Sequence, residues 1–117
     1  MSTETKNKSF SELIKGETPV LVDFYADWCA PCKMMIPILA DLKKRMGDDI
    51  LIIKIDAEKN PAAAIKYQVR GVPSLLLFKE GHVLWQQSGV RQAAELQQII
   101  ETKVAQFNQH QILNSAL

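Results

Sequence analysis

Two apolar segments with the pattern of buried strands, residues 20–25 and 50–55, lie on either side of one long segment with helical spacing. In the first of them only Asp23 interrupts the apolar run, which is typical of a strand covered on both faces. Between the two, apolar residues recur at helical spacing after Trp28 until Gly47 supplies a stop signal. Because strands joined through a helix lie parallel with a right-handed crossover, this order predicts a parallel pair inside an α/β sheet.

The remaining segments add a hairpin and three further helices. A capping-box pattern opens a short first helix over residues 9–15, and an Asn-Pro pair opens another over residues 60–67. Residues 74–79 and 82–87 predict an antiparallel hairpin, and residues 91–107 carry the apolar face of a final helix. The whole order predicts an α/β fold: a central mixed sheet of four to five strands with helices on both faces.

Composition excludes several other classes. A chain of 117 residues, 47% hydrophobic and 23% charged, can bury one core. The formal net charge is +1, and the short basic run at residues 43–45 suits a helix C-terminus, so neither nucleic acid nor a membrane surface is expected as a partner. No apolar run approaches the roughly 18 residues that span a bilayer, and the first ten residues lack the apolar stretch of a secretory signal. We therefore expect a cytoplasmic protein.

Both cysteines of the chain, Cys29 and Cys32, lie where the first strand gives way to the long helix. Side chains three positions apart share one face of a helix, and the first cysteine meets the unpaired amides and positive dipole end of the helix N-terminus. Those groups stabilise a thiolate, whereas a free thiol with a pKa near 8.5 is under about a tenth ionised at neutral pH. The spacing therefore indicates redox chemistry.

A zinc site is the main alternative for two cysteines at this spacing. It requires further ligands, but no second cysteine pair exists, and His82 and His110 lie far along the chain. We expect neither a metal nor another cofactor.

Asp23 stands out for a separate reason. A carboxylate inside a run of buried strand residues is costly unless it is paired, or protonated with a raised pKa. A group whose pKa is moved toward working pH is a candidate for proton transfer.

Taken together, these segments resemble the thioredoxin family over roughly residues 9–107. A lone Cys-x-x-Cys motif is weak evidence, but several motifs in one order are strong evidence. The matching pieces are Val22-Asp23-Phe24-Tyr25-Ala26, the segment from Trp28 to Lys33, Pro37, Lys54, Val72-Pro73, Gly81 and Gly89. The resemblance implies the thioredoxin fold and protein-disulfide reductase activity.

The resemblance also implies a role for each matching residue. Cys29 would be the exposed nucleophile that forms a mixed disulfide, and Cys32 the more buried resolving thiol that closes the Cys29–Cys32 disulfide. Asp23 would move the proton of Cys32, with Lys54 as its partner. The Val72–Pro73 bond would be cis, and substrate would be bound by strand addition at an apolar rim made of Trp28, Ala30, Pro31, Val72, Pro73, Gly89 and Val90.

By the same resemblance, the partners would be disulfide-containing proteins and a thioredoxin reductase, and the protein would be a monomer. A thioredoxin-fold oxidant or isomerase and a non-catalytic binding module remain as alternatives, because fold alone does not imply function.

The sequence departs from the family in three places. Alanine at position 30 replaces the usual glycine, and this substitution stiffens the start of the helix. Residues 1–8 lack the alternation of the family's first strand, so that edge strand is short or missing. Residues 108–117 extend past the usual end, and their composition fits an extra helical turn, a partner-binding segment or a frayed tail.

Overall fold

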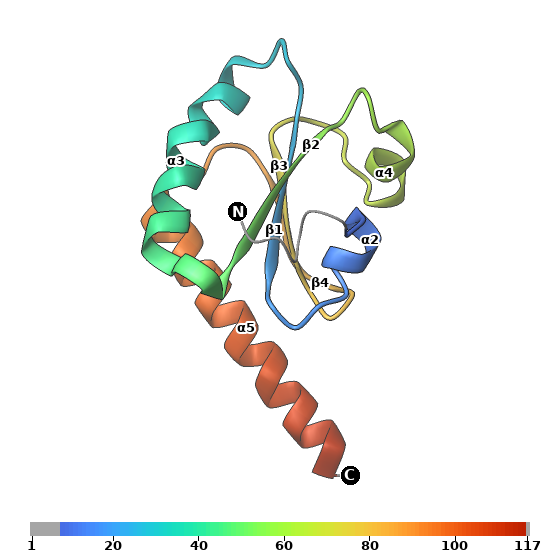
Figure 1. Ribbon diagram of the computed structural model, residues 1–117, viewed down its shortest axis with the longest axis vertical. Helices are drawn as coiled ribbons and strands as arrows, with labels where there is room; N and C mark the ends of the chain where they lie inside the picture. The colour runs from blue at the N-terminus through green and yellow to red at the C-terminus, as the bar shows by residue number, and fades with distance from the viewer. Residues whose placement is uncertain (1–7, 117) are drawn as a thin grey trace.

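The computed structural model describes residues 8–116 of the chain (Figure 1). In chain order the elements are α2 (Phe10–Leu13), β1 (Val20–Tyr25), α3 (Ala30–Met46), the short 3-10 helix η1 (Gly47–Asp49), β2 (Leu51–Asp56), α4 (Pro61–Lys66), β3 (Ser74–Lys79), β4 (His82–Ser88) and α5 (Ala93–Ala116). The strands and helices predicted within residues 9–107 are therefore present. A strand before residue 8 would fall outside the described residues.

The four strands form one mixed sheet in the order β2-β1-β3-β4. β1 pairs in parallel with β2 and antiparallel with β3, and β3 pairs antiparallel with β4. This arrangement confirms the predicted parallel pair and hairpin. Its register places Asp23 directly opposite Lys54 on the neighbouring strand.

Helices cover both faces of this sheet, as predicted. Figure 1 shows α3 and α5 on one side of the strands and α2 and α4 on the other. Alternate strand residues point to opposite faces, so β1 and β3 contribute to two separate cores. The core under α3 and α5 contains Leu21, Met35, Leu39, Leu42, Ile50, Leu75, Leu77, Ala93, Leu96 and Ile100. The core on the α2 and α4 side contains Ile14, Val20, Val22, Phe24, Leu76 and Phe78.

Two local devices hold α2 and the end of α3. The capping box of α2 is present, with the Ser9 hydroxyl accepting from the Glu12 amide. α3 ends at Gly47, whose φ of 56° lies in the region that glycine tolerates best. Just before it, the Lys43 ammonium donates to the carbonyls of Gly47 at 2.8 Å and Ile50 at 2.6 Å. Lys43, in the basic run, thus stabilises the C-terminus of this helix, as the position of the run suggested.

α5 continues well beyond the predicted end at residue 107. Its side chain at Phe107 still contacts the rest of the molecule, with its ring centroid 5.5 Å from that of His82. Beyond it, residues 108–115 are all exposed, including Ile112 and Leu113. Figure 1 shows these last turns projecting past the sheet. The C-terminal extension therefore continues α5 as helix to Ala116.

Within residues 8–116, none of the helices combines the length and the apolar character needed to cross a membrane.

Candidate active site

The two cysteines lie in the first turn of α3, directly after the loop that follows β1. Cys29 is the N-cap residue, and its Sγ atom accepts a hydrogen bond of 3.1 Å from the backbone N–H of Cys32. The two side chains are joined in a disulfide. After reduction, a thiolate on Cys29 would remain at this N-terminus, where unpaired amides and the helix dipole favour negative charge.

The expected contrast in exposure between the two cysteines is not found. Cys29 is 2% exposed and Cys32 is 5% exposed, so Cys29 is not the more accessible residue in this oxidised state. The reason lies in what packs against the pair, since Tyr25 and Val72 cover it. The carbonyl oxygen of Val72 lies 3.7 Å from the Cys29 Sγ atom.

The loop before β3 borders the disulfide on this side. Its Val72–Pro73 bond is cis, which confirms the prediction, and Pro73 is buried. The Gly89 amide donates to the Pro73 carbonyl at 2.8 Å, and the φ of 98° at Gly89 is one that a side chain would strain. This bond brings the loop after β4, including Val90, beside the cis-proline loop. Ser74 secures the same loop through hydrogen bonds from its hydroxyl to the Gly71 carbonyl and with the Ser88 hydroxyl.

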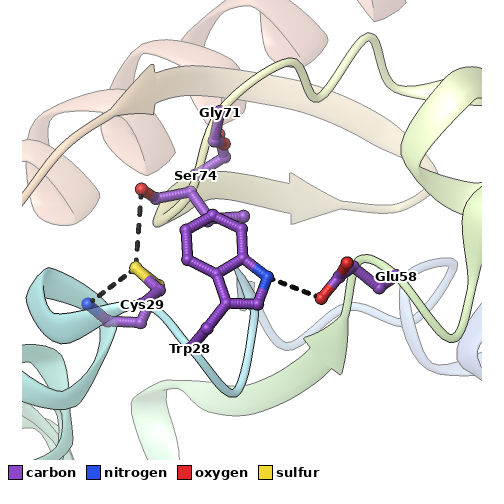
Figure 2. The surroundings of a disulfide bond; sticks show 7 residues. Trp28, Cys29, Glu58, Gly71 and Ser74 are labelled. Carbon is purple, nitrogen blue, oxygen red and sulfur yellow. Dashed lines mark hydrogen bonds between the residues drawn. A yellow bond between two sulfur atoms is a disulfide. The ribbon is translucent and has the colours of Figure 1, made fainter.

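Trp28 is an exposed residue of the rim. Its side chain is a large hydrophobic group that is 70% exposed, and its indole Nε1–H donates to Glu58 Oε1 at 2.7 Å. Figure 2 shows the Trp28 ring between Cys29 and Glu58. Ala30 and Pro31, in the first turn of α3, are also exposed. Sequence analysis missed Glu58, although its place just after β2 is a usable signal, because the ends of the parallel strands β1 and β2 share one edge of the sheet.

Asp23 is buried, as its place in an apolar strand predicted. It is 2% exposed, and its Oδ1 atom has no hydrogen-bond partner. Burial raises the pKa of Asp23 from 3.8 to about 6, and the positive charge of Lys54 opposes part of that rise. Asp23, Cys32 and Lys54 all line one cavity of about 280 Å³. The cavity gives the carboxyl group a path to solvent and to the side of Cys32.

A larger hollow of about 480 Å³ lies between α2 and the start of β2, away from the cysteines. Among residues 8–116, no group of three or more His, Cys, Asp or Glu side chains is arranged to hold a metal ion. A pair that can open and close at a helix N-terminus defines the class of protein as a thiol–disulfide oxidoreductase.

Comparison with known proteins narrows this class. The family model described as Thioredoxin matches residues 1–102. A thioredoxin-like protein of Synechocystis sp. is 43% identical over 105 residues, covering 89% of this chain and 100% of the relative. Thioredoxin C-2 of Corynebacterium nephridii is 39% identical, with 86% and 94% covered. The chain belongs to the thioredoxin family, and its Cys29–Cys32 pair makes it a disulfide oxidoreductase of that family.

Solved structures agree with this assignment. A mutant thioredoxin from Halobacterium salinarum superimposes with a TM-score of 0.72 at 37% identity, covering 83% of this chain and 87% of the other. Mitochondrial thioredoxin 3 of Saccharomyces cerevisiae, in its oxidised form, gives a TM-score of 0.71 at 33% identity, with 80% and 86% covered. The thioredoxin fold predicted from the sequence is thus confirmed.

Proposed function

We propose that this protein reduces disulfides in other proteins, with Cys29 as the attacking thiolate and Cys32 as the resolving thiol. The observation that carries the proposal is the position of the Cys29 sulfur at the N-cap of α3, where it accepts the Cys32 amide hydrogen. An amide that already points at this sulfur stabilises negative charge on it without rearrangement.

The reaction proceeds in two exchanges. The Cys29 thiolate attacks one sulfur of the substrate disulfide, forms a mixed disulfide and releases the other substrate sulfur as a thiolate. Cys32 then loses its proton and attacks the Cys29 sulfur, which closes the disulfide of the enzyme and releases the second substrate sulfur. The substrate gains two electrons and two protons, and the cysteine pair is oxidised.

The surrounding residues act on these two steps. Asp23 has a raised pKa and shares a cavity with Cys32, and it accepts the proton of the resolving thiol. The positive charge of Lys54 stabilises the ionised carboxylate of Asp23. An extended substrate segment lies along the rim and pairs with the backbone beside Val72 and Pro73. The remaining rim positions are Trp28, Ala30, Pro31, Gly89 and Val90.

The proposal extends to the setting of the reaction. A thioredoxin reductase returns two electrons to the oxidised pair after each cycle, and the protein works as a monomer in the cytoplasm, where thiols stay reduced. The purified protein should therefore turn over repeatedly when a thioredoxin reductase and NADPH are added. Size-exclusion chromatography should give the molecular mass of one chain. Cell fractionation tests the location.

The central experiment separates the two sulfurs. Cys32→Ser leaves the helix N-terminus around Cys29 intact but removes the resolving thiol, so mixed disulfides with substrates should accumulate. Cys29→Ser should capture almost nothing. Non-reducing gels and mass spectrometry of adducts measure both, and equal trapping by the two variants would contradict the assigned order.

In parallel, the wild-type protein should accelerate reduction of insulin disulfides by dithiothreitol, and a rate equal to that of dithiothreitol alone would refute the reductase proposal.

A further inference from the structure

We propose that Ile36 is a positioning residue for the resolving step: its aliphatic side chain forms part of the wall of the cavity that Asp23 lines, and it limits the access of water to that carboxyl group. The inference rests on the proposed function, in which Asp23 takes the proton of Cys32. Ile36 acts through Asp23 rather than on the reacting sulfurs.

The first observation is the place of Ile36 in the cavity of about 280 Å³ beside the cysteines. Ile36 lies on α3 four positions after Cys32, and side chains at this spacing are neighbours on one face of a helix. Both line the cavity, together with Lys33 from the same helix. The charged and aromatic residues that line it from other elements are Asp23 and Tyr25 of β1, Asp27 of the following loop and Lys54 of β2. Ile36 thus forms the part of the helix wall that lies one turn beyond Cys32.

The second observation is that neither the core nor the helix accounts for an isoleucine at this position. Ile36 is 54% exposed, and among residues 8–116 it belongs to neither of the two cores described above. At an exposed position of a helix, β-branched isoleucine is a poorer helix former than alanine or lysine. An aliphatic side chain has a use in the cavity wall, because there it separates a buried carboxyl group from water.

The third observation is that the ionisation of Asp23 depends on its contact with water. Asp23 is 2% exposed, and within the described part of the chain its Oδ1 atom has no hydrogen-bond partner. Loss of water raises the pKa of Asp23 more than the positive charge of Lys54 lowers it. On the other neighbouring strand, Leu75 stands opposite Asp23 and carries no charge. The remaining titratable groups on the cavity are Tyr25, Asp27, Cys32 and Lys33. Hydration through the cavity is therefore the property that Ile36 can change.

The direct test is the ionisation of Asp23 itself. Ile36→Ala shortens the side chain and alanine favours the helix, so the fold should persist while more water reaches the carboxyl group. Water stabilises the charged form, so we expect the midpoint of the Asp23 titration to fall by about 0.5–1 pH unit from its wild-type value of about 6. Carbon-13 NMR of the Asp23 carboxyl carbon in the oxidised protein measures this midpoint without any substrate.

The second readout is the rate at which Cys32 closes the disulfide. Reduced protein mixed with excess dithiobis(nitrobenzoate) releases one thionitrobenzoate ion when Cys29 attacks, and a second when Cys32 attacks the resulting mixed disulfide. A weaker base accepts the Cys32 proton less readily, so in Ile36→Ala the second release should slow by about 2- to 4-fold at pH 7–8. The carboxyl group of the variant stays ionised at lower pH, however, so the two pH profiles should cross between about pH 5 and 6. Stopped-flow absorbance measures both releases.

Two further variants separate exclusion of water from other effects of the substitution. Ile36→Leu keeps an aliphatic side chain of the same volume, so the titration midpoint and the pH profile should stay close to those of the wild-type protein. Ile65→Ala makes the same change at an isoleucine that is 78% exposed on α4, and as the matched control it should leave both unchanged. If Ile36→Leu behaves like Ile36→Ala, the aliphatic wall is not responsible and the proposal is wrong.

A double-mutant cycle tests whether Ile36 acts through Asp23. Asp23→Asn leaves no carboxyl group to ionise, so adding Ile36→Ala to that variant should not change the rate of the second release. A further slowing in this background would mean that Ile36 acts on Cys32 directly, which contradicts the proposal.

The outcomes are distinct. An unchanged midpoint in Ile36→Ala, pH profiles that run parallel, or an equal loss of rate in the Asp23→Asn background would each overturn the role of Ile36. Failure of the wild-type protein to reduce insulin would instead refute the proposed function, and the NMR titration would still decide whether Ile36 shields Asp23 from water.

Discussion

Asp23 shows how one buried residue can connect the fold to the chemistry. Its carboxyl group has been removed from water without gaining a hydrogen bond at Oδ1, which disfavours its charged form. The resulting pKa of about 6 means that the group is mostly ionised at pH 7 yet can be protonated readily. Such a group can take a proton from Cys32 and return it to solvent through the shared cavity.

Replacing this carboxyl group should slow the second exchange step. For Asp23→Asn we expect release from the mixed disulfide to fall by about 10-fold or more near pH 7–8, because the variant has no base for Cys32. The gap should narrow below pH 6, where the native carboxyl is itself protonated, and at high pH, where the thiol ionises unaided. Single-turnover stopped-flow measurements from pH 5 to 9 test this, and parallel pH profiles for the two proteins would show Asp23 to be structural.

At the residue level, the sequence reveals residues that are unusual among their immediate sequence neighbours. Asp23 interrupts an apolar strand, so its burial and raised pKa were predictable. Glu58 was missed, because its partner Trp28 lies 30 positions away and the two meet only through the pairing of β1 with β2. The resemblance placed Val72 on the rim beside the cysteines, but it did not show that Val72 would cover Cys29 so closely that this residue is buried.

The elements themselves were predicted more closely than their ends. β1 and β3 have the predicted bounds, because turn residues and buried runs mark both of their ends. Asn60 precedes α4 as expected, but its side-chain amide donates to the Asp56 carbonyl and does not cap the helix. The end of α5 was missed because the periodic core-facing pattern stops at residue 107, whereas no glycine or proline follows to stop the helix.

The two parts of α5 should contribute unequally to stability. Residues 109–115 have exposed side chains, so removing residues 109–117 should change the melting temperature by no more than about 2 °C while helical circular dichroism falls. Phe107→Ala should cost about 1–2 kcal/mol, because that half-buried ring contacts His82. Thermal and urea unfolding measure both. A truncation more damaging than Phe107→Ala would mean that the final turns pack against something in solution.

At the scale of the whole molecule, the topology gathers the site at one edge of the sheet. The carboxyl ends of β1 and β2 lie together because the two strands are parallel, and the antiparallel pairing of β3 with its neighbours brings its first residue and the end of β4 to the same edge. The loops carrying Trp28, Glu58, Val72 and Gly89 therefore meet there, although they are distant in sequence. The two apolar cores lie on the faces of the sheet and support this edge.

This arrangement has a cost in stability that depends on pH. The pKa of Asp23 is about 6 in the folded protein against 3.8 ordinarily, so between these values the folded state binds more protons than the unfolded state. Raising the pH across that window therefore lowers the free energy of unfolding, and a shift of about two units corresponds to about 3 kcal/mol once both states are ionised. Asp23→Asn removes this penalty. The free energy of unfolding of the variant should exceed that of the wild-type protein by a margin that grows from pH 4 to about pH 7 and then levels off.

Urea unfolding of both oxidised proteins at several pH values measures the margin, and taking their difference removes the contributions of all other titrating groups. Leu42→Ala, a fully buried position away from the carboxyl group, is the matched control and should change stability by an amount nearly independent of pH. A margin for Asp23→Asn that is constant over this range would mean that the native carboxyl group is not destabilised by its burial. A margin that shrinks with rising pH would mean that the folded protein stabilises the charged form, the reverse of the desolvation described above.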